Sequence, residues 1–172
     1  MLNRDVVMLS LLYVFYYAHM GVIAPYLGVY LDARGLPSDA IGKLIAITTV
    51  ARIIAPNLWA SLADRTGKGL LIIRIGSVCA FLTFISVFIM QGFWGLALGL
   101  VLSIGFWTSI MPQLEQYTLL IVSGDATRYS HVRLWGSIGF VLMSIICGAV
   151  IDTFGASEVL WCSVVALGLL AV

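Results

Sequence analysis

The chain has 172 residues, of which 62% are hydrophobic and only 10% are charged. A soluble domain is about 45–50% apolar and about 25% charged, because water must cover most of its surface. These values exclude a soluble globular enzyme and a disordered chain. The net charge of +1 comes from charges scattered singly, which excludes a nucleic-acid-binding surface. An integral membrane protein remains, with the lipid bilayer as its surroundings.

Six apolar segments follow one another along the chain, separated by short polar turns. A membrane-crossing helix needs roughly 20 mostly apolar residues. The first segment is too long for the apolar part of a secretory signal peptide, so we expect it to stay in the protein. The sequence predicts an all-α integral membrane fold, in which one bundle of residues 1–172 has helices over 6–31, 41–62, 70–90, 93–122, 130–151 and 157–172. The last helix reaches only about 24 Å of a hydrocarbon core about 30 Å thick, so we expect it to be truncated.

Basic residues near the helix ends predict the orientation, because they concentrate on the cytoplasmic side of a membrane. With a cytoplasmic N-terminus, that side carries most of the basic residues outside the spans, namely Arg4, Arg65, Lys68 and Arg128. The opposite side carries Arg34 and Lys43 together with acidic residues. We therefore expect both ends of the chain to be cytoplasmic.

The three cysteines, Cys79, Cys147 and Cys162, lie in apolar segments without paired spacing. This distribution favours buried free thiols over a disulfide framework or a zinc site. We expect no metal and no cofactor.

Two charged residues within the predicted spans form the most informative pattern. Charges at such positions mark a functional site or a buried pair, because burying them in lipid is costly. Glu115 lies nine residues before Gly124, at the centre of a predicted turn, and Arg133 lies nine residues after it. In an antiparallel hairpin these side chains sit at one depth, where they can pair or jointly bind a polar solute. The alternative is a structural ion pair whose side chains reach toward the cytoplasmic interface.

Three further residues are weaker candidates for contact with a solute. Phe140 lies two helical turns after Arg133 and offers a ring for stacking, although a packing role is equally consistent with the pattern. Arg52 lies in the middle of the second predicted helix and either lines a cavity or pairs with an acid elsewhere. His19 is either a hydrogen-bonded core histidine or a proton carrier.

An internal similarity links the first and fourth predicted helices. Pro25, Leu27 and Tyr30 recur at the same spacing as Pro112, Leu114 and Tyr117, and each proline lies twenty residues into its helix. Transporters are often built from repeated three-helix units, and a proline inside a helix kinks it. The alternative is that proline is common in membrane helices.

The turn after the second helix resembles the signature of the major facilitator superfamily. Asp64, Arg65, Gly67 and Lys68 match the pattern, while Ala60 replaces its first glycine. The resemblance implies half of a twelve-helix fold, made of two three-helix inverted repeats. It also implies that Asp64, Arg65, Gly67 and Lys68 form a gating motif that closes the cytoplasmic side.

A narrower resemblance covers the fourth and fifth helices. The run Pro112-Gln113-Leu114-Glu115, followed by Val132-Arg133-Leu134-Trp135-Gly136-Ser137, resembles the lactose permease and 3-phenylpropionate permease group. The resemblance implies that Glu115 and Arg133 bind the solute, with Phe140 at the position of a stacking aromatic residue. The second run, together with Val50-Ala51-Arg52 in the second helix, more closely resembles the phenylpropionate branch.

Together these features predict the N-terminal half of an inner-membrane transporter and not an enzyme. The expected reaction is proton-coupled symport of an aromatic acid, sugar or nucleoside by alternating access, with the C-terminal six-helix half as the partner. The resemblance places the proton-coupling residues mostly in that second half. One alternative is an intramembrane serine protease using His19 or His131, although Gly136-Ser137-Ile138-Gly139 lacks the usual motif. A second alternative is a membrane assembly subunit that does not transport.

Overall fold

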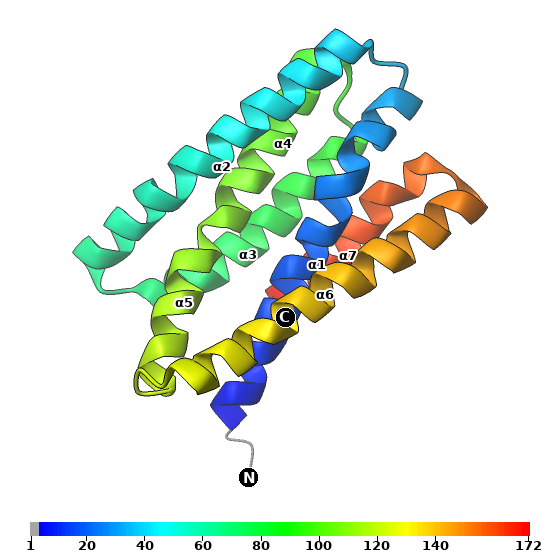
Figure 1. Ribbon diagram of the computed structural model, residues 1–172. Helices are drawn as coiled ribbons and strands as arrows, with labels where there is room; N and C mark the ends of the chain where they lie inside the picture. The colour runs from blue at the N-terminus through cyan, green and yellow to red at the C-terminus, as the bar shows by residue number, and fades with distance from the viewer. Residues whose placement is uncertain (1–3) are drawn as a thin grey trace. The chain divides into compact units, whose positions relative to one another are not determined.

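The computed structural model describes residues 4–172, and Figure 1 shows this part of the chain as a succession of helices. No β-strand occurs within the described residues. In chain order the elements are α1 (Arg4–Ala33), α2 (Ser38–Thr66), α3 (Gly69–Ile85), the 3₁₀ helix η1 (Ser86–Phe88), α4 (Gly92–Thr108), α5 (Ile110–Ile121), α6 (Ala126–Phe154), the 3₁₀ helix η2 (Ala156–Glu158) and α7 (Val159–Ala171).

The helices have the length and composition of membrane spans. Five stretches are long and apolar enough to cross a bilayer, and a shorter apolar stretch covers residues 156–171; the five are residues 4–33, 38–66, 69–88, 92–121 and 126–154. Large apolar side chains are exposed along α2 and α6, such as Leu58 (65% exposed) and Ile145 (66% exposed). Lipid or another apolar partner must cover them. The prediction of an all-α membrane protein is confirmed.

A proline explains the largest difference between the predicted and the observed helices. The helix predicted over residues 93–122 is divided into α4 and α5, with Ser109 between them. Pro112 has no N–H for the carbonyl of Thr108, and its ring clashes with that carbonyl. Helix α4 accordingly ends at Thr108.

Pro25, by contrast, leaves α1 unbroken. The missing N–H of Pro25 deprives the carbonyl of Gly21 of its partner within the helix. The hydroxyl of Ser144 on α6 donates to this carbonyl at 2.8 Å. Backbone groups inside a bilayer have no water to pair with, so this bond replaces the one that proline removes.

Residues 4–27 of α1 and helix α6 belong to one compact unit, formed by residues 4–27 and 114–170, in which they lie side by side (Figure 1). Glycines allow the two backbones to approach closely. A Cβ atom at Gly139 would lie 2.9 Å from the Cα atom of Val14 and closer still to its carbonyl oxygen. The close approach therefore depends on the absence of a side chain at Gly139.

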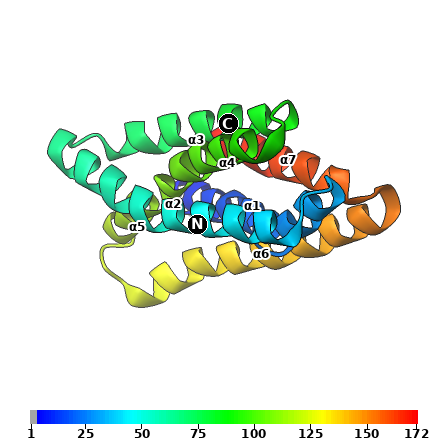
Figure 2. The same cartoon turned by 90° about the horizontal axis from the view of Figure 1, so that it is seen from above.

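Residues 28–113 form a second compact unit, in which α4 packs against both α2 and α3. Figure 2 shows α3 and α4 side by side. The indole N–H of Trp59 on α2 donates to the carbonyl of Gly105 at 3.1 Å. The hydroxyl of Ser103 donates to the carbonyl of Ala80 on α3, also at 3.1 Å. Side-chain-to-backbone hydrogen bonds thus join α4 to both α2 and α3.

The helix pairs in the two units correspond to each other. In the first unit, the first membrane-crossing helix (α1) packs on the fifth (α6). In the second unit, the fourth crossing helix, which begins with α4, packs on the second (α2). In two three-helix repeats the first helix is equivalent to the fourth and the second to the fifth, so both packings join a first helix of one repeat to the second helix of the other. This correspondence agrees with a fold of two three-helix repeats.

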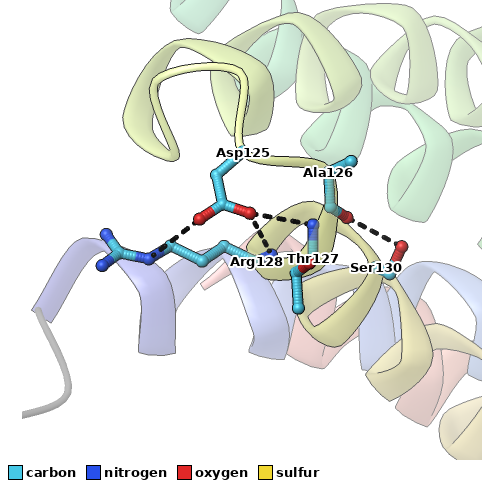
Figure 3. Close-up of polar contacts among 5 residues, drawn as sticks. All are labelled: Asp125, Ala126, Thr127, Arg128 and Ser130. Carbon is cyan, nitrogen blue, oxygen red and sulfur yellow. Dashed lines mark hydrogen bonds and ion pairs between the residues drawn. The ribbon is translucent and has the colours of Figure 1, made fainter.

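An acidic cap fixes the start of α6. The Asp125 carboxylate accepts hydrogen bonds from the backbone N–H groups of Thr127 at 2.9 Å and Arg128 at 3.2 Å, as Figure 3 shows. Its other oxygen lies 3.5 Å from Nε of Arg128. Such a cap satisfies N–H groups that have no partner in the first helical turn. The register of every later residue on α6 follows from this start.

Ser144→Ala should lower the free energy of unfolding in detergent by about 0.5–2 kcal/mol, because the Gly21 carbonyl loses its partner. In a Pro25→Ala background the restored N–H supplies that partner, so the same substitution should have little effect. Thermal unfolding in detergent of the wild type, the two single variants and the double variant measures both losses. Equal losses in the two backgrounds would show that Ser144 does not compensate for Pro25.

Gly139→Ala should destabilise the protein by about 1–3 kcal/mol, because the added Cβ atom meets the Val14 backbone and the two helices must separate. Gly42→Ala is the matched control, since a Cβ atom at Gly42 has no neighbour within 4 Å. The same unfolding measurement compares the two variants. An unchanged midpoint for Gly139→Ala would contradict the close packing of α1 on α6.

Candidate functional site

Glu115 and Arg133 face each other across the turn between α5 and α6. An Nη atom of Arg133 lies 3.7 Å from Oε1 of Glu115. The Arg133 side chain is 50% exposed and the Glu115 side chain is 36% exposed, so water or a solute reaches both. Glu115 and Arg133 are equally distant from Gly124 in the sequence, which predicted that they lie at the same depth. The structure brings these two charges together. At 3.7 Å the contact is longer than the roughly 2.7–2.9 Å of a full charge-assisted hydrogen bond.

Tyr129 joins both members of this ion pair. Its hydroxyl donates to Oε1 of Glu115 at 3.4 Å and accepts from an Nη atom of Arg133 at 3.3 Å. Tyr129 precedes Arg133 by four residues, so the two lie on one face of α6. Tyr129 is not among the residues predicted above to bind a solute, although its helical spacing from Arg133 was a usable signal.

Helix α1 adds two more tyrosines to the same region. Arg133 interacts with the hydroxyl of Tyr17, whose ring is stacked on that of Tyr13 with centroids 6.5 Å apart. The Tyr17 ring lies on Gly136, where a Cβ atom would approach it to 2.5 Å. Tyr13 is fully buried. We call Glu115, Arg133, Tyr129, Tyr17 and Tyr13 the tyrosine cluster.

Only the tertiary structure reveals the contribution of α1 to this cluster. Tyr17 lies more than a hundred residues before Arg133 in the sequence. No local spacing rule connects residues at such a separation. The glycine at position 136 is the one sequence feature that relates to this contact, and its role is visible only with the Tyr17 ring in place.

Phe140 and His19 belong to the same compact unit as the cluster. Phe140 is half-buried on α6, and its backbone carbonyl packs against Gly21 of α1. His19 is buried, at 1% exposure, in α1 two residues after Tyr17. The described contacts of Phe140 are therefore packing contacts.

Arg52 lies on α2, in the second compact unit. The residue is half-buried, and its Nε atom has no hydrogen-bond partner among residues 4–172. A guanidinium in the middle of a membrane span is costly to bury, so Arg52 keeps its interest as a candidate functional residue.

The predicted gating residues form the exposed end of α2. Asp64, Arg65 and Lys68 are exposed, and none of them forms an ion pair within the part of the chain that the structure describes. Gly67 ends the helix with φ 64° and ψ 15°, a left-handed conformation that glycine adopts without strain. Its N–H donates to the carbonyl of Ala63 at 2.8 Å. The charged residues are thus displayed at the surface by a glycine cap.

An apolar groove of about 330 Å³ lies between α2 and α4. Its lining includes Ile54, Leu58 and Leu102, and it contains none of the predicted solute-binding residues. A groove without polar groups has no means of orienting a polar solute. The tyrosine cluster therefore remains the best candidate site for a polar solute within residues 4–172.

Comparison with known proteins identifies the family. The model of the MFS_1 like family matches residues 6–172. Maltose permease of Geobacillus stearothermophilus is 29% identical over 144 residues, which cover 83% of this chain and 36% of that protein. The probable 3-phenylpropionic acid transporter of Escherichia coli (strain K12) is 28% identical over 152 residues, covering 85% of this chain and 38% of that protein.

The matched region amounts to little more than a third of the length of these two relatives. Both relatives are named as solute carriers, which favours a transporter and not an intramembrane protease. The multiple apolar helices agree with a multi-pass membrane protein. Because the family match extends over nearly the whole chain, the chain belongs to the MFS_1 like family of membrane transporters.

Proposed function

We propose that the protein carrying this chain transports a small organic solute across the inner membrane, in symport with protons, by alternating access. The observation that carries the proposal is the half-exposed contact between Glu115 and Arg133 within the tyrosine cluster. The proposed solute classes are sugars, aromatic acids and nucleosides. Two of these classes agree with the names of the relatives, maltose permease and probable 3-phenylpropionic acid transporter.

The chemistry of the pair suits a polar solute. Arg133 offers five N–H donors in a planar fork, and ionised Glu115 offers only acceptors. A solute hydroxyl accepts from the first residue and donates to the second, while a solute carboxylate takes the place of Glu115 on the guanidinium. Because the contact between Arg133 and Glu115 is long, at 3.7 Å, an entering solute displaces only a weak interaction.

Three further residues are weaker candidates for contact with the solute. Phe140 offers a ring against which the apolar face of the solute stacks, and His19 offers a polar group from α1. Arg52 is a separate candidate in the second compact unit, where its Nε atom has no hydrogen-bond partner among residues 4–172.

The gating motif and the absent partner complete the proposal. Asp64, Arg65 and Lys68, presented by Gly67, close the cytoplasmic side through contacts with neighbouring helix ends. A C-terminal six-helix half supplies the other wall of the solute path and most of the proton-coupling groups. No cofactor is needed, because the proton gradient drives the transport.

Glu115→Gln should weaken solute binding by about tenfold or more, because a hydrogen bond to a charged group contributes about 1.5–3 kcal/mol. Binding of radiolabelled maltose, 3-phenylpropionate and uridine to membranes expressing the whole gene product tests this. Glu158→Gln, the same change in η2, is the matched control and should bind as the wild type does. Wild-type protein that binds none of the three solutes, or unchanged binding in Glu115→Gln, would contradict the proposal.

A cytoplasmic N-terminus predicts which turns a reagent reaches from outside the cell. Ser157→Cys, in the exposed turn before α7, should react with a membrane-impermeant maleimide on intact cells. Thr127→Cys, at the exposed start of α6, should react only after the cells are opened. The native thiols give little background, since Cys147 and Cys162 are buried and Cys79 is only partly exposed within the apolar helix α3. The reverse labelling pattern would overturn the orientation.

A further inference from the structure

The hydroxyl of Tyr129 occupies an unusual position between two opposite charges. It contacts the same Oε1 atom of Glu115 that Arg133 approaches, and it also accepts from the guanidinium. A hydroxyl is a neutral group that donates and accepts at once. Tyr129 therefore satisfies part of each charge without neutralising either.

The chain fixes this hydroxyl in place by local structure. The backbone N–H of Tyr129 bonds to the carbonyl of Asp125 at 2.9 Å, in the first turn after the helix cap. Arg133 follows one turn later, and the guanidinium carbon lies 6.0 Å from the centroid of the Tyr129 ring. The cap at Asp125 thus sets the positions of Tyr129 and Arg133 together.

The distances indicate what the hydroxyl does to the ion pair. A guanidinium and a carboxylate that meet freely form contacts of about 2.7–2.9 Å, often two in parallel. Here one contact of 3.7 Å is present, and Tyr129 takes up an Nη donor and an acceptor position that a closed pair would use. Tyr17 on α1 also interacts with Arg133.

We propose that Tyr129 is a positioning residue, which holds Glu115 and Arg133 in an open pair so that a solute can enter between them. The inference rests on the proposed function, because it assigns Tyr129 a role in the same solute site. Without the hydroxyl, Arg133 and Glu115 close onto each other. The solute must then break a full ion pair before it binds.

Tyr129→Phe tests this role because it removes the hydroxyl and keeps the ring. Solute binding, measured with radiolabelled maltose, 3-phenylpropionate and uridine, should weaken about fivefold, which corresponds to about 1 kcal/mol. The maximal uptake rate should change little. Tyr117→Phe on α5 is the matched control, because the described contacts give its hydroxyl no part in the cluster, and its binding should equal that of the wild type.

A double-mutant cycle separates positioning from general destabilisation. In a Glu115→Gln background there is no ion pair to hold open, so Tyr129→Phe should have little further effect on binding. A general structural role would produce the same loss in both backgrounds and would also lower the unfolding midpoint of Tyr129→Phe in detergent.

Each remaining outcome also decides the matter. Unchanged binding in Tyr129→Phe, together with weakened binding in Glu115→Gln, overturns the role of Tyr129 and leaves the proposed function intact. Equal losses of binding in the two backgrounds overturn the positioning role. Normal binding in Glu115→Gln, or no binding of any of the three solutes by the wild type, overturns the proposed function and this inference with it.

Discussion

The structure depends on the rule that backbone polar groups inside a bilayer must find partners within the protein. Pro25 breaks this rule locally, since it leaves the carbonyl of Gly21 without its helical donor. Ser144 restores the missing bond from α6. The bond therefore gives the Gly21 carbonyl a partner and ties α1 to α6 at this level. At Pro112 the outcome differs, because the helix divides after Thr108 into α4 and α5.

The contact between α1 and α6 also builds the candidate site. Glycine at position 139 brings the backbones together, and glycine at position 136 leaves room for the ring of Tyr17. Tyr17 also interacts with Arg133. Close helix packing and the surroundings of the candidate pair are thus linked through small residues on one face of α6. A change at either glycine alters the surroundings of Arg133 without touching its charge.

Much of the fold and part of the site were predictable from local patterns. Hydropathy and turn residues located the apolar segments, because lipid accepts few residue types. Equal distances from Gly124 predicted that Glu115 and Arg133 meet, because a hairpin of two helices maps sequence distance onto depth. The same helical spacing could have predicted that Tyr129 belongs to the site. Tyr17 could not have been predicted from the sequence, since its contact with Arg133 depends on how α1 packs.

The amino-acid sequence by itself determined that this is a multi-span membrane protein of the MFS_1 like family and that one acid–base pair lies at a common depth. Composition is sufficient for the membrane class and spacing for the common depth, because these depend on solvent and on the rise of a helix. The family follows from the match of its model to residues 6–172. Only the tertiary structure decided that the pair stays open at 3.7 Å with Tyr129 against both charges. It also decided that one proline divides a helix while another does not. These outcomes depend on which side chain from a distant segment reaches a given backbone or charged group, and packing alone sets that.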